Sequence, residues 1–250
     1  MKSKMSRVVQ SLLAIITFFM VWEIASRFLQ KTLLPSPILV FRQFPVLFHE
    51  KESWLHLEAS FYRVFLGLFF SVVGGFLLGL GMGTFKKIAT FSDALVYFTY
   101  PIPKMALLPI VMLLGGLGDQ SKIIMIVLIV LPQVTIAVRD AIRDIPKNYY
   151  DVYRTLKASK LQCFWAITLP ATLPAIFSSV RVSLGTALSI LFFTENYGTE
   201  YGLGYFIMDS WTRMDYPSMY GGILVLAICG FLLFLTIDLI THYLFRWRKN

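Results

Sequence analysis

Six stretches of the chain are almost entirely apolar, with polar segments between them. They are Val8–Phe28, Phe61–Phe85, Ala94–Leu117, Ser121–Val138, Leu173–Thr194 and Met219–Tyr243. A helix that crosses a bilayer needs about 20 consecutive, mostly apolar residues. The pattern therefore predicts an all-α membrane protein with six transmembrane helices.

The composition agrees with this reading and excludes a soluble globular domain. Of the 250 residues, 57% are hydrophobic and 15% are charged, whereas soluble domains have about 45–50% and 25%. The first apolar stretch follows basic residues as a signal peptide would, but Trp22, Glu23 and Arg27 stand where a cleavage site would need small residues. We divide the chain into an uncleaved N-terminal anchor helix (1–30), an external connecting segment (31–60) and a membrane core (61–245), with a long inner loop at about 139–172.

The formal net charge of +9 is unevenly placed along the chain. If the N-terminus is inside, the outer segments carry only a few of the 23 Lys and Arg residues, namely Arg27, Lys31, Arg42, Lys51 and Arg213. Cytoplasmic loops of membrane proteins are enriched in Lys and Arg. We therefore expect both termini in the cytoplasm, a multi-pass protein in contact with membrane lipid, and no nucleic-acid partner.

Two of the predicted spans carry small residues at every fourth position. The second span has Gly67, Ser71, Gly75, Gly79 and Gly83, and the fifth has Ala175, Ser179, Ser183 and Ala187. This spacing puts each set on one helix face, where bare backbone allows helices to approach closely. The faces predict tight packing inside one bundle, with a homodimer seam as the alternative.

The long inner loop contains a pattern typical of a short amphipathic helix. Pro146 suits a helix start, and the residues at helical spacing after it are apolar or aromatic: Tyr149, Val152, Tyr153 and Leu156. Such a helix can dock into a groove on a partner protein. The residues themselves are equally compatible with a helix that lies on anionic lipid headgroups.

This loop resembles the EAA loop of permease subunits of bacterial ABC importers, whose pattern is E-A-A, three residues, G, nine residues, I-x-L-P. Ile167-Thr168-Leu169-Pro170 fits its end, Asp151-Val152-Tyr153 replaces Glu-Ala-Ala, and Lys157 replaces the glycine. Arg154-Thr155-Leu156 and Ala158-Ser159 match the R-T-L-x-A-S of the aliphatic sulfonate, taurine and nitrate branch. Further blocks are similar to that branch from about residue 33 to the C-terminus: Leu34-Pro35-Ser36-Pro37, His56 to Gly67, Pro101 to Pro109 and Gly202-Leu203-Gly204-Tyr205 after Glu195.

The resemblance implies a type I ABC importer permease in the bacterial inner membrane. It implies a pathway formed with a second permease subunit, for which we expect an identical chain, an external solute-binding protein, and two cytosolic ATPase subunits that grip residues 150–159. These are Tyr150, Asp151, Val152, Tyr153, Arg154, Thr155, Leu156, Lys157, Ala158 and Ser159. The chain has no G-x-x-x-x-G-K-[ST] phosphate-binding loop, so we expect ATP and Mg²⁺ on the ATPase partner and neither catalysis nor a cofactor in this chain.

Lys157 is the clearest departure from the family pattern. A glycine at such a point allows a turn with positive φ, and lysine in the same turn would cost about 1 kcal/mol. Either the turn differs in this chain, or it is retained and a matched groove on the ATPase accepts the lysine.

A few polar residues in the apolar stretches are candidates for contact with a solute. Pro101 and Pro103 should break the third helix, and irregular backbone at that depth is tolerated where it lines protein or water. We therefore predict that Tyr100, Pro101, Pro103 and Lys104 line the pathway, with Lys104 offering positive charge to an anionic solute; the alternative is a snorkelling or structurally paired lysine. Glu195 could contact solute or pair with Arg63, and Arg181 is interpreted as a structural ion partner on the cytoplasmic side.

No metal site is predicted. His49, Glu52 and His56 have a spacing that would share a helix face, but their charged neighbours indicate a solvated surface, and the two cysteines, Cys163 and Cys229, form no ligand motif. Two other function classes are weaker: a membrane enzyme would need a catalytic cluster at one depth, and a secondary transporter would show internal repeats and midplane acidic groups. The sequence does not select the solute among sulfonates, nitrate and thiamine precursors.

Overall fold

The computed structural model describes residues 2–28, 33–49, 51–99 and 101–246, and this part of the chain is helical without strands. The helices in order are α1 (Lys2–Phe28), α2 (Pro37–His49), α3 (Lys51–Thr84), α4 (Lys86–Thr99), η1 (Lys104–Leu107), α5 (Leu108–Gly115), α6 (Asp119–Arg143), α7 (Lys147–Thr155), α8 (Lys160–Cys163), the π-helical turn η2 (Phe164–Thr168), α9 (Leu169–Glu195), α10 (Leu203–Thr212) and α11 (Tyr216–Leu244). The predicted all-α class is confirmed.

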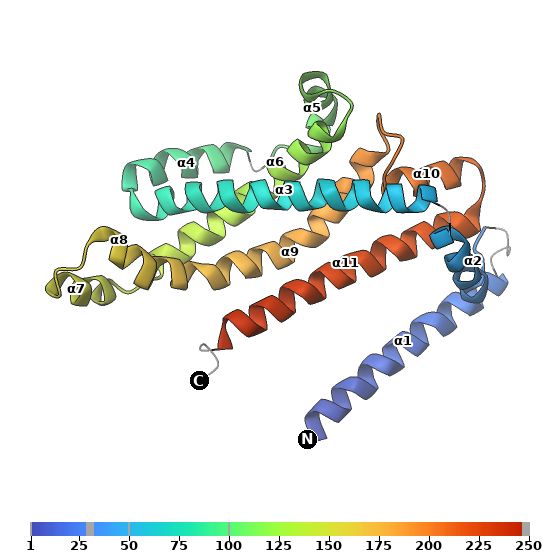
Figure 1. Ribbon diagram of the computed structural model, residues 1–250, viewed down its shortest axis with the longest axis horizontal. Helices are drawn as coiled ribbons and strands as arrows, with labels where there is room; N and C mark the ends of the chain where they lie inside the picture. The colour runs from blue at the N-terminus through green and yellow to red at the C-terminus, as the bar shows by residue number, and fades with distance from the viewer. Residues whose placement is uncertain (1, 29–32, 50, 100, 247–250) are drawn as a thin grey trace.

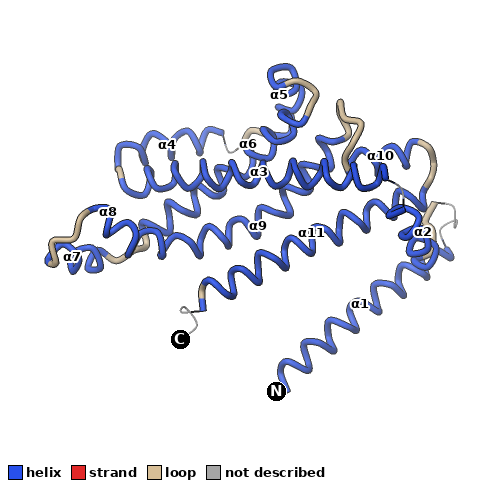
Figure 2. The backbone as a smooth tube through the Cα atoms, viewed as in Figure 1, coloured by secondary structure: helices blue, strands red, loops and turns tan. Residues whose placement is uncertain are grey.

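The long helices are arranged along one direction, and the short ones gather at the two ends (Figure 1). α7 and α8 lie at one end of the long axis, and α2 and α10 lie at the other. α3, α6 and α9 form the body, α11 runs beside α9, and α1 diverges from α11 (Figures 1 and 2). The inner loop that the sequence singled out is therefore the tip of the molecule.

Four helical segments are long and apolar enough to cross a membrane: α3, α6, the continuous run Lys160–Glu195 that includes α9, and α11. They correspond to the second, fourth, fifth and sixth predicted stretches, and α1 covers the first. α3 begins ten residues before the predicted span, so the external connecting segment is helical over much of its length: it contains α2 and the first turns of α3.

The third predicted stretch is not one continuous helix: the chain breaks at its prolines, as the sequence predicts. α4 ends at Thr99, and the segment η1–α5 that follows is bent from it by 86°. Pro101 and Pro103 lie in the break, where proline removes a backbone donor and its ring clashes with the preceding turn. The prolines thus turn the chain sharply instead of kinking a straight helix.

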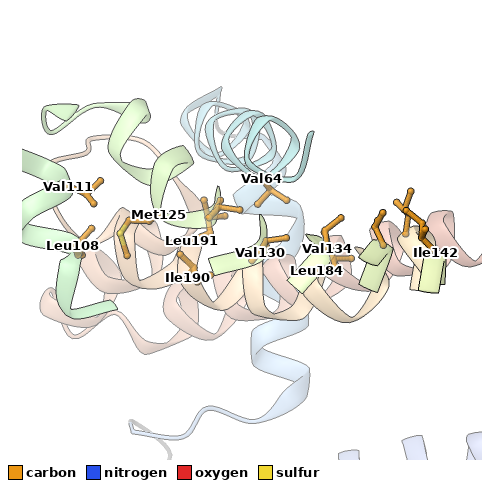
Figure 3. Close-up of a cluster of buried hydrophobic side chains, with 14 residues drawn as sticks. Val64, Leu108, Val111, Met125, Val130, Val134, Ile142, Leu184, Ile190 and Leu191 are labelled. Carbon is orange, nitrogen blue, oxygen red and sulfur yellow. The ribbon is translucent and has the colours of Figure 1, made fainter. Parts of the chain in front are cut away.

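The core lies along α6, between α3 and α9. Val130, Val134 and Val138 have no exposed surface, and Figure 3 shows the buried side chains in a line along this helix. α9 contributes Leu184, Ile190 and Leu191 to the cluster.

The small-residue face of α3 packs directly on α6. A Cβ atom added at Gly79 would lie 2.7 Å from the carbonyl oxygen of Thr135 and 2.7 Å from Cβ of Val138. The same clash occurs along the face, where Gly67 meets Ile126, Gly75 meets Val134 and Gly83 meets Ile142, while buried Ser71 bonds the Gly67 carbonyl. The predicted packing inside one bundle is confirmed, and this face is not free to form a homodimer seam.

Candidate functional site

The inner loop forms the predicted amphipathic helix. α7 begins at Lys147, directly after Pro146, whose extended backbone (φ −60°, ψ 135°) precedes the first turn. Tyr149 and Val152 are each 58% exposed and Leu156 is 73% exposed, whereas Tyr153 is half-buried. Apolar side chains with this exposure at helical spacing form a face that has no cover in the described chain.

The turn after α7 is a Schellman motif with a lysine in the glycine position. The Ala158 amide donates to the Tyr153 carbonyl at 3.0 Å, and the Lys157 amide donates to the Arg154 carbonyl at 2.9 Å. These are the two bonds that define the motif. Lys157 has φ 53°. The turn with positive φ is therefore present although lysine replaces the glycine of the family pattern, and Lys157 carries the backbone strain of this conformation.

The following residues fix the direction of the chain into α9. Ser159 caps α8 through a reciprocal pair: the Gln162 amide donates to Ser159 Oγ at 3.2 Å, and the Ser159 amide donates to Gln162 Oε1 at 2.7 Å. The hydroxyl groups of Tyr150 and Thr168 are 2.9 Å apart and join α7 to η2. This hydrogen bond links α7 to the turn that leads into α9.

The outer part of the loop carries mixed charge around the exposed apolar face. Asp151 and Arg154 form an exposed ion pair at 3.3 Å, and the Thr155 hydroxyl donates to the Val152 carbonyl at 2.7 Å. Beyond the turn, Leu161 and Trp165 are also exposed. An apolar strip with polar edges is the composition of a surface that docks a partner protein.

The bent third segment places Lys104 in η1, next to the break. Pro101 and Pro103 are exposed and Lys104 is half-buried. Among the described residues, Lys104 has no ion-pair or hydrogen-bond partner, while Tyr100, the fourth predicted member of this group, lies outside them.

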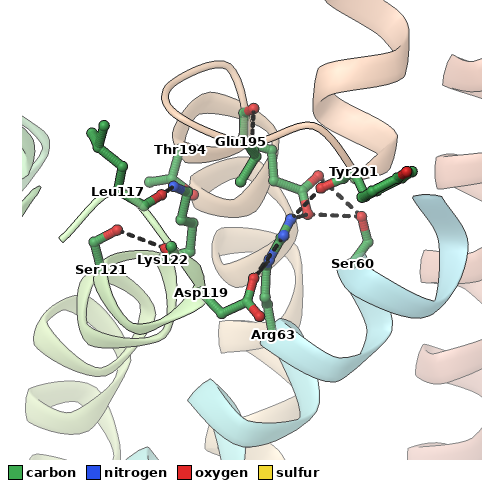
Figure 4. Close-up of polar contacts among 12 residues, drawn as sticks. Ser60, Arg63, Leu117, Asp119, Ser121, Lys122, Thr194, Glu195 and Tyr201 are labelled. Carbon is green, nitrogen blue, oxygen red and sulfur yellow. Dashed lines mark hydrogen bonds and ion pairs between the residues drawn. The ribbon is translucent and has the colours of Figure 1, made fainter. Parts of the chain in front are cut away.

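Glu195, also predicted as a pathway residue, is fully buried and belongs to a polar cluster with Ser60, Arg63 and Asp119 (Figure 4). Nη1 of Arg63 donates to Glu195 Oε1 at 2.6 Å and to the Tyr201 carbonyl at 2.8 Å. Nε of Arg63 donates to Asp119 Oδ1 at 2.8 Å. The structure supports the pairing of Glu195 with Arg63. The Glu195 carboxylate is enclosed by protein.

Two glycines after α9 wrap the backbone around the Glu195 carboxylate. The Gly204 amide donates to Glu195 Oε2 at 2.8 Å. Gly202 has φ 149°, and a Cβ there would lie 2.4 Å from Cδ of Glu195. Ser60 donates to both carboxylate oxygens, at 2.8 and 3.0 Å, and accepts from the Leu203 amide. The G-L-G sequence thus serves to close the chain over a buried charge.

Lys122 is a buried charge whose position sequence reasoning missed. Its side chain is fully buried at the start of α6, and its ammonium group donates to the Leu117 carbonyl. Figure 4 shows it on the far side of Asp119 from Arg63. The sequence feature that could have revealed this buried lysine is its position three residues after Asp119, inside an apolar stretch. Arg181, by contrast, was identified correctly as an ion partner: it bonds both carboxylate oxygens of Asp238 at 2.9 Å.

The residues weighed as a metal site are not brought together. His56 is buried, and its Nδ1 accepts the Gly202 amide at 3.0 Å. His49 is exposed in α2, and Glu52 is exposed in the first turn of α3. The spacing that put the three residues on one helix face is interrupted by the junction of α2 and α3.

A comparison with family models matches residues 71–250 to the binding-protein-dependent transport system inner membrane components. The chain is 31% identical over 250 residues to the formylaminopyrimidine transport permease protein ThiX of Halalkalibacterium halodurans, covering 98% of this chain and all of that protein. It is 28% identical over 233 residues to the taurine transport system permease protein TauC of Escherichia coli, covering 91% and 85%. It is 30% identical over 219 residues to a putative aliphatic sulfonates transport permease protein, SsuC, of Bacillus subtilis, covering 88% and 79%.

A comparison with solved structures gives the same fold. A chain from the MetNI methionine ABC transporter, in an inward-facing conformation, superposes with a TM-score of 0.61 at 22% identity, over 84% of this chain and 97% of that chain. A second crystal form of the same transporter gives a TM-score of 0.58 at 18% identity.

Proposed function

Because the chain belongs to the family of binding-protein-dependent transport system inner membrane components, we propose specific roles for its loop, its bent segment and its partners. The chain is an inner-membrane permease subunit of an ATP-driven importer, and ATP is hydrolysed by a partner subunit. The proposals below concern topology, coupling, assembly and solute.

We propose that the chain crosses the membrane six times with both termini in the cytoplasm. α1, α3, α6, α9 and α11 each cross once, and α4 with η1 and α5 crosses as a broken span. The support is the placement of most Lys and Arg on the side of the α7–α8 loop, since six crossings would return the chain to the side on which it begins.

We propose that residues 150–159 couple the permease to the ATPase. The observation that carries this proposal is the uncovered face formed by Tyr149 and Val152 of α7 and by Leu156 directly after it. In water such a face is costly, at about 25 cal/mol per Å² of apolar surface, and docking into a groove would remove the cost. The Tyr150–Thr168 bond gives a route from this face to α9. ATP and Mg²⁺ would bind the ATPase dimer, not this chain.

The assembly proposed is two permease subunits, two ATPase subunits and an external solute-binding protein. We expect the two permeases to be copies of this chain. The exposed apolar residues of α5, where Leu113 and Leu114 are 86% and 85% exposed, offer contact surface for a second copy. Residues 100–104 would then line the pathway at the junction, and Lys104, which lacks a partner in the described chain, would face it.

Two solute classes remain within this function. The relatives for taurine and aliphatic sulfonates import anions or zwitterions that carry a sulfonate, and Lys104 could attract such a group. The relative for formylaminopyrimidine imports an uncharged ring with N–H donors.

The test of the importer assignment is ATPase activity of the permease co-expressed with its ATPase subunit in lipid nanodiscs. Activity is measured with and without the solute-binding protein, using taurine, other sulfonates, nitrate and formylaminopyrimidine. We expect one solute class to stimulate turnover in the presence of the binding protein. If permease and ATPase do not associate, the coupling role of residues 150–159 is refuted.

A further inference from the structure

A groove of about 640 Å³ lies between α6 and α9, in the halves of these helices nearest α7 and α8. Its lining includes Gln133 and Asp140 from α6 and Ser178 and Ser179 from α9, with alanines between them. Binding pockets for small molecules measure about 300–1,000 Å³, so the groove has room for a single-ring solute. Both helices are long and apolar enough to span the membrane, where polar side chains face a cavity or a polar partner.

Gln133 is oriented by a hydrogen bond to its side-chain oxygen, and its side-chain N–H donors have no acceptor among the described residues. Its Oε1 accepts the buried Ser183 hydroxyl at 2.8 Å. A glutamine amide has two further N–H donors, and these have no acceptor among the described residues; neither do the hydroxyl groups of Ser178 and Ser179 have a partner there. Unpaired polar groups are costly in a membrane, so these groups favour a polar occupant of the groove over an apolar one.

The charge of the lining selects the occupant. Asp140 and Asp144 contribute carboxylates at the inner end, and within the described chain no Lys or Arg lines this groove. Arg181 of α9 is turned toward α11, where Asp238 neutralises it, and Arg139 bonds Asp140 from outside the groove at 2.8 Å. Since Arg139 already neutralises Asp140, an oxyanion would meet the Asp144 carboxylate, which has no ion-pair partner among the described residues, whereas a solute with N–H donors would meet acceptors.

We propose that this groove is a contact site for an uncharged or cationic solute that carries N–H donors, such as an aminopyrimidine, and that it disfavours oxyanions. The Gln133 amide donates to a ring nitrogen or carbonyl of the solute, and Ser178 and the Asp144 carboxylate accept its N–H groups, with Ser179 beside them in the lining. This proposal rests on the importer function and selects between its two solute classes.

The test is protection of an introduced cysteine from a water-soluble maleimide. Ser179→Cys is made in a Cys163→Ser, Cys229→Ala background, and Glu200→Cys, in the exposed loop after α9, is the matched control. The permease–ATPase complex in nanodiscs is labelled without binding protein, in the presence of formylaminopyrimidine, taurine or nitrate. We expect formylaminopyrimidine alone to slow labelling of the Ser179 variant, with no effect on the control. Adding Gln133→Leu should raise the half-protecting concentration about tenfold, the effect of one lost hydrogen bond.

Three results would overturn the proposal: no protection by any solute, protection by taurine or nitrate instead, or a spontaneous disulfide between two Ser179→Cys chains, which would mean that a second copy fills the groove. Stimulation of ATPase by the loaded binding protein is measured on the same preparations. If stimulation is normal while protection is absent, the groove assignment fails and the importer function stands. If subunit association and stimulation are both absent, the importer function fails as well.

Discussion

The buried ion pair of Arg63 and Glu195 permits a sharp test of how this permease is held together. Glu195→Gln removes one charge and keeps nearly the same volume. The Arg63 guanidinium would remain buried, with Asp119 as its one remaining carboxylate partner. The glutamine NH₂ group would also face a backbone amide, that of Gly204, which now donates to a carboxylate oxygen.

The size of the effect follows from burial. Breaking a buried pair by removal of one partner costs about 3–5 kcal/mol, and we expect about 3 kcal/mol because Asp119 still compensates part of the charge of Arg63. The matched control is Asp238→Asn, which removes a partner of Arg181 with similar 2.9 Å geometry but with both side chains 39–46% exposed. Exposed pairs contribute about 0–1 kcal/mol.

The assay is unfolding of the purified permease–ATPase complex in nanodiscs, followed by tryptophan fluorescence in denaturant. We expect a clear loss of stability for Glu195→Gln and almost none for Asp238→Asn. A double-mutant cycle with Arg63→Gln should give a coupling energy of more than about 1 kcal/mol. Equal stability of both single variants and wild type would refute the view that the cluster fastens α3 to α9.

Three further predictions concern the coupling loop and the helix interface. Lys157→Gly should relieve the positive φ and stabilise the turn by about 1 kcal/mol, seen as slower amide hydrogen exchange at the end of α7; faster exchange would contradict the strain. Leu156→Ala should leave the permease folded but reduce ATPase stimulation at least several-fold, because it truncates the most exposed apolar side chain of the proposed docking face, Tyr149, Val152 and Leu156; wild-type stimulation would remove this residue from the proposed coupling surface. Gly79→Ala should destabilise the protein by about 1–3 kcal/mol through overpacking, whereas Gly185→Ala, where a Cβ meets nothing within 4 Å, should be neutral or slightly stabilising; thermal unfolding of the two variants compares them directly.

Much of the loop that contains α7 and α8 could be predicted because its structure is local. A proline followed by apolar residues at helical spacing is enough to specify α7, and the Schellman turn depends on bonds between residues only three to five positions apart. The family pattern also indicated the turn at Lys157. Whether the backbone would keep positive φ with lysine there was open, and the structure shows that it does.

The path of the chain in the third span could be predicted only in part. The prolines predicted a break, but not an 86° change of direction, because a broken helix has no hydrogen-bonded continuation to define its angle. The direction of η1 and α5 is set by packing of residues such as Leu108 and Val111 against α6. This is a tertiary contact between two helices, and the sequence of neither helix by itself specifies it.

The sequence alone thus determined the apolar helices, the amphipathic tip, the small-residue face of α3 and the family, since each depends on residue type and on spacing along one helix. Only the tertiary structure decided which helix the small face meets, that Arg63 pairs with both Glu195 and Asp119, and that buried Ser183 holds Gln133 at the edge of one groove. Glu195 lies 132 residues from Arg63 along the chain, and Ser183 lies 50 residues from Gln133. Helix formation is set by hydrogen bonds four residues apart, whereas these pairs form only after whole helices have packed together.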